Sequence, residues 1–175
     1  MGKQSDLYLD FEIDKLTNSI LNRISGDSFP TEISLLNHNE LKHIHKKSGW
    51  NFDWKKEYAD IEREVYKLSI EHNSDIVQGL ISLSIKPDHI FMNLLESASF
   101  NRGEEKLYEG VAGNLVAFAC KVSFQRGAEG FVAFDSKTNL IRHYEKTLGA
   151  VHFGGHRMII DSIAATRLIN QYFKV

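Results

Sequence analysis

The chain has 175 residues, 42% of them hydrophobic, and 23 acidic against 21 basic residues give it a formal charge of −2. This length and apolar content predict a domain with its own core, and the lack of a basic excess argues against a nucleic-acid partner. The apolar runs are too short to cross a bilayer and the first six residues lack a signal-peptide pattern, so we expect a cytoplasmic protein without a membrane partner. The single cysteine, Cys120, lies in an apolar stretch that predicts a small buried side chain.

The first 30 residues do not predict a definite structure. Residues 7–13 alternate apolar and polar side chains like a strand, whereas residues 16–24 fit a helix and an extended segment equally well. We therefore treat residues 1–30 as an N-terminal extension and residues 31–175 as a single domain. Two prolines and no low-complexity run give no sign of a linker or a second domain.

The remaining chain predicts a mixture of strands and helices. The expected elements of its first half are a strand at 31–36, a helix capped by Asn37 or Asn39 that ends near Gly49, a short helix at 53–60, and two antiparallel strands at 64–70 and 76–85. In the second half they are a buried strand at 89–98, an amphipathic helix at 111–126, a strand at 130–134, a short helix at 140–147 and a last amphipathic helix at 162–173.

A glycine-punctuated turn lies between the strand at 89–98 and the helix at 111–126. Gly110, Ala112 and Gly113 leave room for a ligand beside the backbone, and the first N–H groups of a helix have no partners inside the helix. The positive end of the helix dipole favours an anion there. Taken alone, the pattern fits an ordinary tight turn as well as a phosphate site.

Two motifs in this order resemble those of the GNAT superfamily of acyl-CoA-dependent N-acyltransferases. Residues 110–115, Gly-Val-Ala-Gly-Asn-Leu, are similar to the family's pyrophosphate loop. Residues 143–150, His-Tyr-Glu-Lys-Thr-Leu-Gly-Ala, are similar to the aromatic-Tyr-Glu-Lys-Leu-Gly motif that follows the next strand. The resemblance extends over about residues 33–161, and the two motifs together are far more specific than either alone.

The chain departs from the family pattern at three positions. Leu107 stands where Arg or Gln is usual, and we expect the adjacent Lys106 to supply that charge. Ser97 stands where an aliphatic residue usually contacts the pantetheine arm, and Lys137 stands where an Asn often precedes the catalytic tyrosine. These departures leave the expected phosphate site in place and leave the acyl preference open.

The resemblance implies an α/β (α+β) fold with a mixed, mainly antiparallel sheet that opens between two strands to admit pantetheine, and with helices on both faces. Residues 152–153 and 157–161 would form the last hairpin. The helix at 162–173 lies beyond the usual end of this fold, so we expect it either to pack on the sheet or to mediate a homodimer.

The resemblance also implies direct transfer of an acetyl group from acetyl-CoA to a primary amine of a small molecule, peptide or protein. Tyr144 would protonate the departing thiolate, because a phenol is protonated at neutral pH. Glu96 is a candidate base for the amine and equally a candidate outward-facing strand residue. The residues expected to bind acetyl-CoA are Glu96, Ser97, Lys106, Tyr108, Gly110, Val111, Ala112, Gly113, Asn114 and Lys137.

The sequence leaves two alternative functions. A non-catalytic acyl-CoA-binding or protein-interaction module would keep the fold without turnover. A nucleotide-phosphate enzyme is less favoured, because no Gly-Lys-Ser/Thr follows the glycines. The eight histidines predict no metal site, since no Cys pair or His-Glu-x-x-His motif accompanies them. His152 and His156 flank a glycine turn, where solvated side chains are more common than pocket residues.

Overall fold

The computed structural model describes residues 8–15 and 19–173. The strands are β1 (Ile20–Asn22), β2 (Ser28–Phe29), β3 (Thr31–Leu35), β4 (Glu64–Ile70), β5 (Gly79–Ile85), β6 (Ile90–Ser97), β7 (Tyr108–Glu109), β8 (Val132–Asp135), β9 (Val151–His152) and β10 (Arg157–Ile160). The helices are α1 (His38–Leu41), α2 (Trp54–Ala59), α3 (Val111–Gln125), α4 (Ile141–Leu148) and α5 (Ser162–Tyr172), with 3₁₀ turns η2 (Lys46–Ser48), η3 (Ser99–Asn101) and η4 (Thr138–Leu140).

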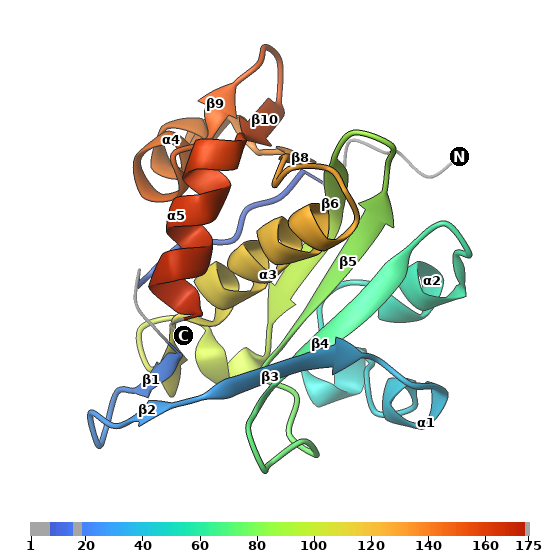
Figure 1. Cartoon of the computed structure of the whole chain (residues 1–175). Helices are drawn as coiled ribbons and strands as arrows, with labels where there is room; N and C mark the ends of the chain where they lie inside the picture. The colour runs from blue at the N-terminus through green and yellow to red at the C-terminus, as the bar shows by residue number, and fades with distance from the viewer. Residues whose placement is uncertain (1–7, 16–18, 174–175) are drawn as a thin grey trace.

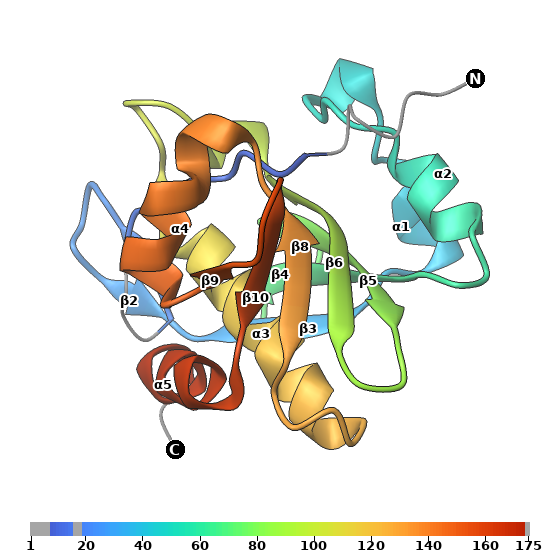
Figure 2. The same cartoon turned by 90° about the horizontal axis from the view of Figure 1, so that it is seen from above.

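These strands form two sheets (Figure 1). The larger has the order β3-β4-β5-β6-β8-β10-β9, and every neighbouring pair in it is antiparallel except β6 and β8. Helices α3 and α5 lie on one side of this sheet and α1 and α2 on the other (Figures 1 and 2). The expected mixed, mainly antiparallel sheet with helices on both faces is therefore confirmed.

Local capping explains where several helices begin and end. Asn37 accepts a hydrogen bond from the Glu40 N–H while the Glu40 carboxylate accepts one from the Asn37 N–H, which is a complete capping box for α1. Asp53 caps α2. Gly149 ends α4 with a φ of 68°, a left-handed conformation that suits glycine. Asn37 and Asp53 confirm the predicted starts of α1 and α2, and Gly149 follows α4, which ends one residue beyond the predicted end at 147.

The helix predicted between Asn37 and Gly49 is shorter than expected. Helix α1 ends at Leu41, and a separate 3₁₀ turn, η2, follows it. The Ser48 hydroxyl donates to the carbonyl oxygens of His43 and His45 and accepts a hydrogen bond from the His45 N–H. A side chain that bonds to the backbone in this way competes with a continuous helix.

The second sheet was not predicted. It has the order β2-β1-β7 and joins residues 20–29 to Tyr108 and Glu109, just before α3. Each of its strands is two or three residues long, too short for a periodic pattern. Part of the N-terminal extension thus supports the loop that precedes α3.

The main core lies between α3 and the sheet. Strands β4, β5 and β6 are buried along most of their length, and Leu115, Val116 and Cys120 on α3 are fully buried. Burial raises the pKa of the Cys120 thiol to about 12, as expected for a packed and unreactive side chain.

Within residues 8–15 and 19–173, no helix is long and apolar enough to cross a membrane.

Strands β6 and β8 separate soon after they meet. They pair at Ile90 with Val132 and at Phe91 with Ala133, whereas β6 continues to Ser97. The register between β5 and β6 skips Asn93, whose side chain donates to the Ser84 hydroxyl. An extra residue of this kind bends a strand and increases its twist. The sheet therefore opens at the carboxyl ends of two parallel strands.

Candidate active site

A cavity of about 350 Å³ lies at this opening. Carboxyl ends of parallel strands are a common place for a ligand site, because the strands diverge and the loops after them surround the gap. Its walls come from the end of β6, from residues 101–106 in and after η3, from the start of α3 and from the loop before α2. A further wall comes from an extended piece of the N-terminal region, residues 10–14.

Of the residues expected to bind acetyl-CoA, five line this cavity. They are Glu96, Ser97, Lys106, Val111 and Ala112. Gly110 precedes Val111 as the N-cap of α3 with a φ of 94°, and a Cβ there would lie 3.1 Å from the Ser19 carbonyl oxygen. Only glycine combines this conformation with so close a contact.

The start of α3 holds an anion from the protein itself. The Gly110 N–H donates to Asp14 Oδ1 at 3.1 Å, and Lys106 Nζ lies 2.9 Å from Asp14 Oδ2. A helix N-terminus with a lysine beside it has the chemistry of a phosphate site, and here the Asp14 carboxylate stands in that place. Lys137 likewise lies 2.7 Å from Asp10 Oδ2.

Tyr144 lies on α4, fully buried beneath the same segment. Its hydroxyl donates to the Phe11 carbonyl oxygen at 2.5 Å, and its ring lies 4.9 Å from the Phe11 ring and 5.2 Å from that of Phe134. Burial raises the pKa of Tyr144 above its usual value, and the carboxylates of Asp10 and Glu12 raise it further. The phenol is therefore protonated throughout the neutral range.

Glu96 is buried and fully engaged with the loop before α2. Its carboxylate accepts hydrogen bonds from the indole N–H of Trp54 at 2.7 Å and from the backbone N–H groups of Asn51 and Phe52 at 2.7 and 3.3 Å. Arg102 Nη1 lies 3.5 Å from Glu96 Oε2. The alternative of an outward-facing Glu96 is therefore wrong, because its side chain is only 3% exposed and ties β6 to this loop.

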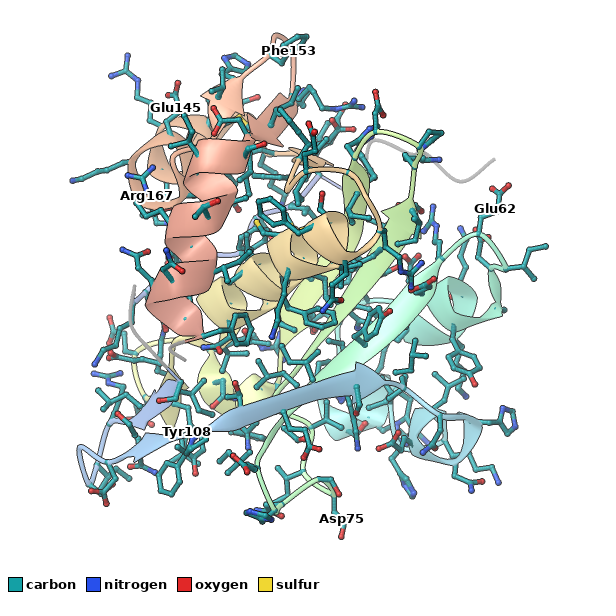
Figure 3. All side chains as sticks on the ribbon, viewed as in Figure 1. Glu62, Asp75, Tyr108, Glu145, Phe153 and Arg167 are labelled. Atoms are coloured by element: carbon teal, nitrogen blue, oxygen red, sulfur yellow. The ribbon has the colours of Figure 1, made fainter. Side chains whose placement is uncertain are left out.

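Three of the expected residues serve the packing around the site. Asn114 donates to the carbonyl oxygens of Ser19 and Gly110, so it stabilises the turn before α3. Gly113 faces α5, where a Cβ would lie 1.9 Å from Tyr172 Oη. Tyr108 lies on β7, with its ring 5.9 Å from that of Phe29. Figure 3 shows Tyr108 beside the small sheet and far from Glu145 on α4.

The histidines near the last hairpin bond to backbone oxygens. His152 Nε2 lies 2.9 Å from the Gly155 carbonyl oxygen and is exposed. His156 Nδ1 lies 2.8 Å from the Ser136 carbonyl oxygen, and its ring stacks on Tyr8 at 3.8 Å. Among the described residues, no group of three or more His, Cys, Asp or Glu side chains is placed to hold a metal ion.

Two features of the site were not predicted from the sequence. One is the position of residues 8–15 beside Gly110 and Tyr144, although the alternation at 7–13 indicated an extended segment. The other is the bulge at Asn93, which the sequence shows only as a polar residue within an apolar strand. Both features determine the shape of the opening between β6 and β8.

No family model and no curated protein matches the sequence. Solved structures do match the fold. The spermidine N-acetyltransferase of Vibrio cholerae in complex with CoA and spermine has a TM-score of 0.55 and 16% identity, and the match covers 78% of this chain and 98% of that one. For AtaTR bound with AcCoA the TM-score is 0.53, the identity 12%, and the coverage 79% and 97%.

The ribosomal-protein-S18-alanine N-acetyltransferase of Escherichia coli is also similar. Its TM-score is 0.50, the identity is 13%, and the match covers 75% of this chain and 94% of that one. At such identities the similarity concerns the arrangement of the backbone. The chain has the fold of the GNAT N-acetyltransferases, as its two motifs predicted.

Proposed function

We propose that the protein is an N-acetyltransferase that transfers an acetyl group from acetyl-CoA to a primary amine. One observation carries the proposal. The cavity at the opening between β6 and β8 is lined on one side by an anion-binding helix start, beside Gly110 and Lys106, and on another by Phe11, which covers a buried and protonated tyrosine, Tyr144. An acyl-CoA requires both features, because it carries phosphates at one end and a thioester that releases a thiolate at the other.

The residues at the phosphate end fit acetyl-CoA. Gly110 and Lys106 already hold one anion, the Asp14 carboxylate, and Val111 and Ala112 line the cavity at the helix start. Lys137 supplies a second cation, now paired with Asp10. We expect the diphosphate to take the place of Asp14 at the start of α3.

The residues at the thioester end fit as well. Acetyl-CoA would supply an activated carbonyl for attack by the amine. Beyond the bulge at Asn93, the backbone of β6 up to Ser97 faces the opening and would hold the acyl arm and polarise its carbonyl through an N–H group. Tyr144 would then protonate the departing sulfur, since its raised pKa keeps the hydroxyl protonated.

Glu96 supports this chemistry best as a positioning residue. Three hydrogen bonds and an ion pair already engage its carboxylate, so direct removal of a proton from the amine would require these partners to move. By holding Asn51 and Phe52, Glu96 fixes one wall of the cavity. The acceptor amine then reaches the site deprotonated or loses its proton to water.

A specific observation favours the alternative of a non-catalytic module. The Gly110 N–H and the Tyr144 hydroxyl are both bonded to residues 8–15 in the same structure. In a protein without catalytic activity, residues 8–15 could remain bonded to Gly110 and Tyr144 at all times.

Turnover separates the two functions. Release of CoA thiol is followed with acetyl-CoA and a panel of primary amines: a diamine, a peptide with a free N-terminus and a lysine peptide. The buried Cys120 does not consume the thiol reagent. We expect turnover with at least one amine, and Tyr144→Phe should lower kcat by about 10²-fold or more while the chain still binds acetyl-CoA.

Each other result has a defined meaning. Binding of acetyl-CoA without turnover on any amine supports the non-catalytic module. If the native chain and Tyr144→Phe have equal kcat values, Tyr144 is not the general acid. A chain that binds neither acetyl-CoA nor CoA, even after residues 8–15 have been loosened by substitution, contradicts the proposed function.

A further inference from the structure

Residues 8–15 run in an extended conformation from the end of β8 toward β1 and pass the site on the way (dark blue in Figure 1). We propose that this segment is a built-in inhibitor that occupies the acetyl-CoA site and must leave it before acetyl-CoA binds. The inference rests on the proposed function and adds its regulation. Three sets of contacts support this inference: those of the backbone of the segment, those of its charged side chains and those of its apolar side chains.

The backbone of the segment takes the place of a strand partner. The Leu9 N–H donates to the Asp135 carbonyl oxygen at 2.7 Å, and the Leu9 carbonyl oxygen accepts a hydrogen bond from the Lys137 N–H at 3.0 Å. These two bonds form a parallel bridge between Leu9 and Ser136, directly after β8. The segment therefore enters the gap at the point where β8 has lost β6 as a neighbour, which is where an extended pantetheine arm would lie.

The charges of the segment match those of the ligand. Asp14 holds both the Gly110 N–H and Lys106, and Asp10 holds Lys137. All three partners were expected from the sequence to bind acetyl-CoA, and all three are satisfied by carboxylates from one short stretch. An acidic segment and a diphosphate cannot occupy these groups together.

The apolar side of the segment covers the proposed acid. Leu9 and Ile13 are buried, and Phe11 lies between them against Tyr144. The Tyr144 hydroxyl donates to the Phe11 carbonyl oxygen, so no hydrogen is left to protonate a sulfur. On the other side of Phe11, the Ile13 N–H donates to His143 Nε2 at 2.9 Å. While the segment is in place, catalysis by Tyr144 is blocked.

The contacts that hold the segment suit a reversible closure. Beyond the bridge at Leu9 the segment forms no regular strand, and the side chains of the pair between Asp10 and Lys137 are about half exposed. Exposed ion pairs of this kind hold weakly in water. The burial of Leu9 and Ile13 favours the closed form, and the apparent Kd for the ligand then increases in inverse proportion to the fraction of open molecules.

The test uses the full-length chain and free CoA. Calorimetry compares the native protein with Phe11→Ala, which removes the ring from Tyr144 without a change of charge, and with Asp10→Asn/Asp14→Asn, which removes the competing carboxylates. The control is Glu62→Gln/Asp75→Asn, two exposed positions far from the segment (Figure 3) that change the net charge equally. Hydrogen exchange of the peptide that contains residues 8–15 is followed with and without CoA.

We expect CoA to bind the native chain and the control equally, and both variants of the segment at least tenfold more tightly. CoA should also speed exchange at the Leu9 and Ile13 amides of the native chain. Equal affinity in all four proteins, with residues 8–15 protected in the CoA complex, would overturn the inhibitor and leave the acetyltransferase intact. If none of the four proteins binds CoA, the proposed function itself fails.

Discussion

Glu96 is a charged side chain enclosed by donors that the fold brings from 42 to 45 positions away along the chain. A buried carboxylate is stable when its oxygens accept several hydrogen bonds and it faces a cation, as Glu96 does with Arg102. This arrangement makes Glu96 costly to remove, whatever its role in the reaction.

We therefore expect Glu96→Ala to lower the free energy of unfolding by about 3–5 kcal/mol, because it leaves buried donors without an acceptor and Arg102 without its carboxylate. Glu96→Gln keeps an acceptor oxygen and should cost less. Urea unfolding measures both, with the exposed Glu62→Gln as a control expected to change stability by less than about 0.5 kcal/mol. A stable Glu96→Gln protein that has lost turnover but not acetyl-CoA binding would return Glu96 to the role of base.

The residues of the site differ in how far the sequence predicts them. Tyr144 and Gly110 are found by motif, because each depends on its immediate neighbours in the chain. Their partners Phe11 and Asp14 are not, because 133 and 96 positions separate the bonded residues and no local pattern specifies such a pairing. The contacts that decide whether the site is open are therefore the ones that the sequence leaves unspecified.

At the scale of elements, the close contact of α3 with α5 depends on one small residue. A Cβ on Gly113 would lie 1.9 Å from Oη and 2.2 Å from Cζ of Tyr172, both in a ring that is fully buried. Glycine was expected here so that a phosphate could approach. The structure shows that Gly113 also has a packing role, and α5 rests on α3.

We expect Gly113→Ala to destabilise the protein by about 1–3 kcal/mol, because the added methyl group overpacks a filled interface. In a Tyr172→Ala background the same substitution should have little effect, since the clashing ring is gone. Urea unfolding of the four proteins forms a double-mutant cycle that isolates this contact. Equal costs of Gly113→Ala in both backgrounds would mean that the contact with Tyr172 is not the cause.

Length and capping separate the predicted elements from the missed ones. The long strands and α3 were found because several turns or alternations of apolar residues repeat, and Asn37 and Gly149 mark helix ends by their own chemistry. Strands β1, β2 and β7 have two or three residues each and exist because they pair with one another. This pairing joins segments that are distant in the chain, so the local sequence of each strand does not predict it.

At the scale of the whole molecule, the order of the two motifs was enough to predict the fold. The opening of the sheet was predicted too, because it follows from the same resemblance. The closure of that opening by residues 8–15 was not predicted, since those residues lie outside the motifs. A similar fold in other proteins therefore says little about whether this site is accessible.

Three buried tyrosines make the protein less stable at alkaline pH. Burial, together with the neighbouring carboxylate of Glu64, raises the pKa of Tyr66 to about 12, and burial raises those of Tyr144 and Tyr172 as well. In the unfolded chain these phenols titrate near 10. Below that pH both states keep their protons, and stability is at its full value. Above it the unfolded state loses protons that the folded state retains, so stability falls as pH rises through the folded pKa values.

Each such group contributes a slope of at most about 1.4 kcal/mol per pH unit, and the slopes add. We expect the urea midpoint to change little between pH 7 and 8, to begin to fall as the unfolded Cys120 thiol titrates at about 8.5, and to fall more steeply above about pH 10, where the tyrosines join it. Tyr66→Phe should flatten the fall between pH 10 and 12, because it removes the hydroxyl that donates to Glu64 at 2.6 Å. A midpoint that is constant up to pH 11 would mean that these tyrosines titrate equally in both states and that their burial does not control their ionisation.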